Sequence, residues 1–258
     1  MSALRLLWHQ FSYDQKLFWR EPSAVFFTVA LPVAFLFLFA GVLGSRPAVV
    51  DGRSLPGSVY YVPAIVTLGL VTATFVNIAI SLTIARERGL LARVRSTPLP
   101  AWVYLAARAA TSVVIGLVLA AVLAALGRIA FGVALPVAAL PGALLALGVG
   151  AAAFSALGFA VSAVIPSENA APPLTNVLVL PLLLASGVFV ESSSLPEGLQ
   201  RAADVLPVKP LFEALLLAFT PGAGFPGIAW GKLAVVALWG VAGAAAAVRF
   251  FRWFPRES

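Results

Sequence analysis

The stretch ARERGLLARVRSTPLPAWVY, residues 85–104, carries four arginines within ten positions and lies between two long uncharged stretches. The first of these runs from Ser54 to Ala85, and the second runs from Ala109 to Gly127. Apolar stretches of this length predict transmembrane helices, and short loops rich in Arg stay on the cytoplasmic face of a membrane. We therefore expect residues 86–95 to lie in a cytoplasmic loop between two spans.

The composition places the whole chain in the same class. Of 258 residues, 61% are hydrophobic and only 10% are charged, and the mean hydropathy is +1.01. These values predict a single polytopic membrane domain, residues 1–258. The chain has no cysteine, which excludes disulfides and thiolate metal sites. Its pI near 10.6 could suggest a nucleic-acid partner, but 11 of the 17 Lys and Arg fall in three segments expected on one side of the membrane.

The apolar pattern predicts an all-α protein with six transmembrane helices. An amphipathic interfacial helix occupies residues 1–22, with Leu4, Leu7, Trp8, Phe11 and Phe18 on one stripe. The bundle, residues 23–250, has spans at about 23–44, 59–85, 104–126, 140–165, 174–190 and 228–250, and residues 251–258 form a cytoplasmic tail.

The segments between the spans carry further expectations. Residues 45–57 should be a polar loop, Arg128 should end the third span, and residues 166–173 should form a tight turn. Two short outer-face helices should lie between spans five and six. The first starts at a capping-box pattern that pairs Ser194 with Glu197, and the second covers Leu211–Phe219. The inner segments hold eleven Lys and Arg against six in the outer segments, which predicts cytoplasmic termini.

The sequence offers no chemistry for catalysis. The only histidine is His9, no HExxH pattern or paired aspartates occur, and there is no glycine-rich phosphate loop. We expect the chain not to be an enzyme, and we interpret Ser155 as a packing residue rather than a nucleophile. The spans carry no ionisable residue near their middle, so we expect the energy source to lie outside the membrane domain.

The second span is more polar than a lipid-facing helix requires. Asn77, Thr74 and Ser81 are candidates for lining a translocation path, and Asn77 is the strongest of them. The alternative for the hydroxyl side chains is that they hydrogen-bond to the backbone of their own helix.

Three segments together resemble the permease subunits of type-2 ABC exporters, a class that exports drugs, lipids and polysaccharides. They are FWREP at the end of the first helix, RERGLLARVRSTPLP, and SLPEGLQRAADVLPVKPLFEAL before the last span. The second is the most specific, because it matches the family's E-x-G-[TL]-[LI]…T-P pattern at Glu87, Gly89, Leu90, Thr97 and Pro98. The resemblance covers nearly the whole chain.

The resemblance implies that this loop folds as a coupling helix, which docks on a separate ATP-hydrolysing subunit. Leu90, Leu91 and Val94 would fill an apolar groove of that subunit, and flanking arginines such as Arg93 would pair with acidic residues on its rim. The alternative is that the arginines only set the topology. The implied complex holds two ATPases, which bind the ATP and Mg, and two permeases, most simply two copies of this chain. No cofactor is expected in the chain itself.

The resemblance also implies that the outer short helices form part of an exit gate, at Leu195, Pro196, Pro207 and Pro210. We expect a hydrophobic drug or a lipid-like cargo crossing the cytoplasmic membrane, with a polysaccharide or glycolipid as the alternative. A different class also stays open, namely a channel or carrier that works without an ATPase.

Overall fold

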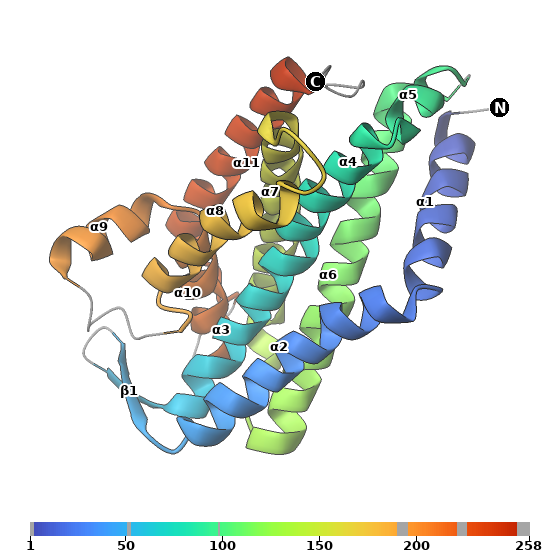
Figure 1. Cartoon of the computed structure of the whole chain (residues 1–258). Coiled ribbons are helices and arrows are strands. Elements are labelled where there is room, and N and C mark those ends of the chain that lie inside the picture. The colour runs from blue at the N-terminus through green and yellow to red at the C-terminus, as the bar shows by residue number, and fades with distance from the viewer. Residues whose placement is uncertain (1–2, 51–52, 98, 190–195, 221–225, 252–258) are drawn as a thin grey trace.

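The computed structural model describes residues 3–50, 53–97, 99–189, 196–220 and 226–251. Within these ranges the chain is a bundle of helices with one small β-hairpin (Figure 1). The helical elements are α1 (Ala3–Trp19), α2 (Pro22–Val42), α3 (Gly57–Val71), the π-helical turn η1 (Thr72–Val76), α4 (Asn77–Glu87), α5 (Leu90–Arg95), α6 (Ala101–Phe131), the short 3₁₀ turn η2 (Val137–Ala139), α7 (Leu140–Val164), α8 (Ala171–Ala185), α9 (Glu197–Val205), α10 (Val208–Phe219) and α11 (Trp230–Phe250).

The helical bundle contains apolar helices suited to a membrane. Among the described residues, four stretches are long and apolar enough to cross one, namely Gly57–Glu87, Trp102–Phe131, Val137–Val164 and Trp230–Phe250. They correspond to the predicted spans two, three, four and six. The predicted spans one and five coincide with the shorter apolar helices Thr28–Val42, within α2, and Ala171–Ala185. The protein is therefore a multi-pass membrane protein, and its six-span layout stays a prediction.

The continuous stretch α3–η1–α4 runs through the middle of the bundle and is the most buried of these four stretches (Figure 1). The start of α1, the end of α11, α5 and the turn from α7 to α8 lie toward one end, which we call the termini end. The hairpin and the last turns of α6 lie at the opposite end, which we call the hairpin end. The arginine-rich segment thus shares its end of the bundle with both terminal helices.

Two predicted span boundaries are wrong. Helix α6 continues through Arg128 to Phe131 and ends where Gly132 adopts a φ of 69°, a left-handed conformation that other residues disfavour. Helix α8 begins at Ala171, inside the predicted turn, because its two prolines fit the first turn of a helix. It ends at Ala185, where the Ser186 hydroxyl donates to the carbonyl of Leu183 at 2.7 Å.

The predicted polar loop 45–57 contains an antiparallel hairpin, which corrects the all-α expectation. Strand β1 (Pro47–Val50) pairs with β2 (Arg53–Pro56), and Pro47 lies opposite Pro56. The Gly57 amide donates to the carbonyl of Arg46 at 3.0 Å and closes the hairpin at its base. Prolines are tolerated at the ends of edge strands, where no ladder hydrogen bond is lost.

Helix α1 packs along α6 and turns a polar side toward it. Asp14 is 5% exposed, and Gln10 donates a hydrogen bond of 3.0 Å to its carboxylate. Burial raises the pKa of Asp14, and the charge of Arg108 on α6 opposes that rise. Leu4 and Trp8 of the predicted apolar stripe are exposed, at 82% and 67%, on the side away from the bundle. The interfacial position of α1 stays a prediction.

Helix α9 begins later than the capping-box pattern predicts. Its N-cap is Pro196, without a side-chain hydrogen bond, and Glu197 is its first residue. Ser194 lies outside the described residues. Helix α10 begins three residues before the predicted Leu211, since Pro207 is its N-cap and Pro210 falls within its first turn.

Candidate functional site

The segment between α4 and α6 forms the candidate site at the termini end of the bundle (Figure 1). Only Arg88 and Gly89 separate α4 from α5. Gly89 has a φ of 69°, its amide donates to the carbonyl of Arg86 at 2.9 Å, and its carbonyl accepts from the amide of Arg93 at 3.1 Å. One glycine in the left-handed region therefore ends α4 and starts α5.

The short helix α5 has one face exposed at the surface and another face buried in the bundle. Leu91 is fully buried in the chain's own interior, so the prediction that it fills a groove of a partner is not consistent with this conformation. Leu90 is 46% exposed, Val94 is partly exposed, and the side chain of Arg93 is exposed. The outward face thus combines apolar and cationic side chains, while Leu91 fixes α5 to the bundle.

Hydroxyl side chains close the C-terminal end of α5. The Thr97 hydroxyl donates to the carbonyl of Val94 at 2.6 Å, and the Ser96 hydroxyl donates to the carbonyl of Arg93 at 2.8 Å. The backbone amides of Ser96 and Thr97 also donate to these two carbonyls, at 3.2 and 3.1 Å, so the hydroxyls add a second hydrogen bond to each. Pro98, the other predicted residue here, lies outside the described residues.

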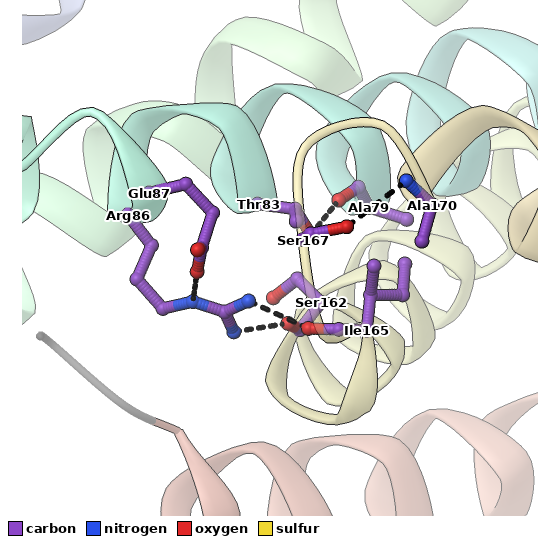
Figure 2. Close-up of polar contacts among 8 residues, drawn as sticks. All are labelled: Ala79, Thr83, Arg86, Glu87, Ser162, Ile165, Ser167 and Ala170. Carbon is purple, nitrogen blue, oxygen red and sulfur yellow. Dashed lines mark hydrogen bonds and ion pairs between the residues drawn. The ribbon is translucent and has the colours of Figure 1, made fainter. Parts of the chain in front are cut away.

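Glu87 does not cap α5, which has no side-chain cap at its N-terminus. Its carboxylate instead accepts a hydrogen bond of 2.9 Å from Nε of Arg86, as Figure 2 shows. The two terminal nitrogens of Arg86 donate to the carbonyls of Ser162, at 2.8 Å, and Ile165, at 2.6 Å. The Arg86 side chain is only 2% exposed. The end of α4 is therefore bound to the end of α7 through a buried guanidinium.

A second ion pair joins the same two regions on the surface. Arg88 donates to Glu168, in the turn between α7 and α8, at 2.9 Å. These side chains are 64% and 38% exposed, so water screens the attraction. The sequence analysis expected flanking arginines of this segment to pair with an ATPase, with a purely topological role as the alternative, and it did not predict this pair within the chain.

The predicted path residues of the second span have unequal surroundings. Thr74 is fully buried and its hydroxyl donates to the carbonyl of Leu70 at 2.7 Å, as the backbone-bonding alternative expected. The Ser81 hydroxyl is buried without a hydrogen-bond partner among the described residues. Asn77 is partly buried and directly follows the π-helical turn η1, a feature that often occurs at functional sites. Their role in transport stays a prediction.

Two of the predicted exit-gate residues, Pro196 and Pro207, are the N-caps of α9 and α10. Pro207 precedes α10 and Pro210 is buried in it, whereas Leu195 lies outside the described residues.

Beside Pro207 and Pro210 is a charged network that the sequence did not reveal. Lys209 is 6% exposed and donates to Asp204 of α9 at 2.7 Å, and Glu213 of α10 pairs with Lys232 of α11 at 2.5 Å. Three helices are thus linked by four charges.

An apolar cavity of about 180 Å³ lies next to this network. Phe75 of η1, Phe154 of α7, Leu182 of α8, Pro207 and Trp239 of α11 contribute to its lining. The Trp239 indole nitrogen donates to the carbonyl of Val205 at 2.7 Å, so its polar atom is already satisfied. Within the described ranges, no three His, Cys, Asp or Glu side chains gather as a metal site would require.

Comparison with known proteins identifies the family. The profile described as "ABC-2 type transporter" matches residues 5–220. The chain is 27% identical over 205 residues to a protein of Bacillus subtilis (strain 168) named "Putative transport permease YvfS", and the alignment covers 79% of this chain and 81% of that protein. The chain belongs to the ABC-2 type transporter family, as a membrane permease and not as a catalytic enzyme.

Proposed function

We propose that this chain is the membrane-spanning subunit of an ATP-driven exporter, and that α5 is the helix on which a separate ATPase docks. Family membership implies an ABC ATPase partner in general. The outward face of α5 carries the proposal, because it presents Leu90 beside the cationic side chain of Arg93 while Leu91 holds the helix in place. Such a face suits an apolar groove with an acidic rim.

The proposed complex contains two copies of this chain and two ATPases, which supply the ATP and Mg sites. We place it in the cytoplasmic membrane with both termini and α5 in the cytoplasm. The location of α5 at the termini end supports this arrangement, because one end of the bundle then meets the ATPases. The excess of Lys and Arg in the inner segments supports the same orientation.

We propose a hydrophobic drug or a lipid-like molecule as cargo. The apolar cavity beside η1 supports this choice over a polysaccharide, because its walls offer hydrophobic contact and no set of hydrogen-bonding side chains for sugar hydroxyls. A short-chain fluorescent phospholipid and a fluorescent hydrophobic amine are suitable probes.

Reconstitution tests the proposal. The tagged chain, purified in mild detergent, should retain an ATPase, and vesicles containing both proteins should move a probe only when ATP is supplied. Vesicles with the permease alone are the control. Probe movement without any ATPase would instead support a channel or carrier, and purification without an ATPase under several detergents would contradict the docking role of α5.

A further inference from the structure

At the C-terminus of α7 a backbone carbonyl lacks its usual amide donor, and a side chain of another helix donates to it instead. In an α-helix, the carbonyl of Ser162 would accept from the amide of residue 166, but residue 166 is proline and has no amide hydrogen. Helix α7 ends at Val164, and Arg86 of α4 donates to the Ser162 and Ile165 carbonyls at 2.8 and 2.6 Å (Figure 2). A cation is also favoured at this end of the helix dipole.

The guanidinium is suited to this role in a way that an ammonium is not. Nε of Arg86 donates to Glu87 while its two terminal nitrogens donate to α7, so each of its three nitrogens has a partner. The fork of an arginine is planar and fixed, whereas lysine offers a single nitrogen on a flexible stem. Because the side chain is 2% exposed, water cannot replace a lost partner easily.

The same region also holds the start of α8. Ala79 of α4, Ile165 after α7 and Ala171 of α8 are buried together in one apolar cluster. Farther along, α7 approaches the second span so closely that a side chain at Gly158 would lie 2.9 Å from the carbonyl of Phe75. Helix α4, the end of α7 and the start of α8 are therefore in tight contact, and Arg86 is the buried polar connection between α4 and the end of α7.

We propose that Arg86 is the positioning residue that transmits a displacement of α5 to α7 and α8. This inference rests on the proposed docking of an ATPase on α5. Helix α5 follows Arg86 by four residues, so a force on α5 acts first at the end of α4. Without Arg86 the end of α4 would keep only apolar contacts and the exposed Arg88–Glu168 pair with this region, so less of the displacement would reach the turn between α7 and α8. With it, the turn between α7 and α8 moves as well, and spans four and five respond to the ATPase that contacts only α5.

Cysteine labelling tests this transmission without knowledge of the cargo, because the chain has no cysteine of its own. Leu90→Cys reports ATPase docking on α5, and Asn169→Cys, in the exposed part of the turn, reports movement there. In the complex with ATPase, Leu90→Cys should be protected from a thiol reagent, and a non-hydrolysable ATP analogue should change the labelling rate of Asn169→Cys. In Arg86→Gln the protection should persist, while the response at 169 should fall about tenfold.

Arg88→Gln is the matched control, since it removes the exposed pair between the same regions and should alter the response at 169 by less than about twofold. An Arg86→Gln complex that responds like the parent would overturn the inference and leave the proposed docking intact. Loss of protection at Leu90→Cys in Arg86→Gln would show that Arg86 only maintains the fold of α5. Absence of protection in the parent would remove the docking proposal and this inference together. If Arg86→Gln does not insert, Arg86→Lys decides by the same criteria.

Discussion

Substitutions of Gly89 can distinguish two reasons why a glycine precedes α5. One reason is the backbone, which has a φ of 69° and a ψ of 10° there. The other is close approach by a partner. A β-carbon at Gly89 would meet nothing within 4 Å in this chain, so the internal cost of Gly89→Ala is conformational alone. That cost is about 1–2 kcal/mol for a residue other than Gly or Asn, and it corresponds to a factor of about 5–30 in an equilibrium.

The assay is a titration of the reconstituted permease with its ATPase. If the left-handed turn must form for α5 to dock, Gly89→Ala should raise the Kd about 5–30-fold, whereas Gly89→Asn should raise it less than about fivefold, since asparagine tolerates this region. Gly132→Ala is the matched control, because Gly132 also has a φ of 69° and open space around it but lies at the hairpin end. If Gly89→Asn weakens docking more than Gly89→Ala, the backbone explanation is wrong. The larger side chain would then obstruct close approach by the ATPase.

Four further predictions concern other parts of the molecule. Burial raises the pKa of Asp14 above its usual 3.8, so the packing of α1 should be fully stable below that pH and should weaken as pH rises through the raised pKa. Asp14→Asn should abolish this loss in thermal unfolding measured across pH, and an unchanged pH profile would contradict the assignment. Lys209→Met should lower the free energy of unfolding by about 1–3 kcal/mol, because it removes a buried charged donor; no change in the unfolding midpoint would show that the network is not stabilising. Asn77→Leu should reduce probe transport while the ATPase still copurifies, and the reverse pattern would place Asn77 in assembly instead. An impermeant thiol reagent should label a cysteine at Arg93 only from the cytoplasm and one at Glu197 only from outside, and external labelling at Arg93 would refute the topology.

The sequence predicted the helices well where local chemistry determines their ends. Proline fits the first turn of a helix, and α2 begins at Pro22, one residue from the expected start. The fourth predicted span, 140–165, agrees with α7 to within one residue. The end of α6 was missed because charge at Arg128 was given more weight than the glycine four residues later, although a helix stops more readily at glycine than at arginine.

The sequence pattern located the candidate site, but it did not predict the contacts within the site. Arg86 donates to carbonyls that are 76 and 79 residues away in the sequence. Contacts between residues so far apart in the sequence depend on how α4 and α7 pack. Pro166 was a usable signal, since it leaves the Ser162 carbonyl without a donor. Leu91 was assigned to a partner because a six-residue helix shows too little periodicity to tell which apolar side chain faces inward.

The shortness of α8 has a consequence for the surrounding lipid. Its 15 residues cover about 22 Å, whereas the hydrocarbon core of a bilayer is about 30 Å thick. In the proposed layout α8 is the fifth span, so a bilayer that matched its length would be thinner there by about 8 Å. Mismatch of this kind costs a fraction of a kcal/mol per Å and is relieved by thinning and by tilted acyl chains. Lipids beside α8 would then already be distorted, and less work would be needed to draw one out of its leaflet.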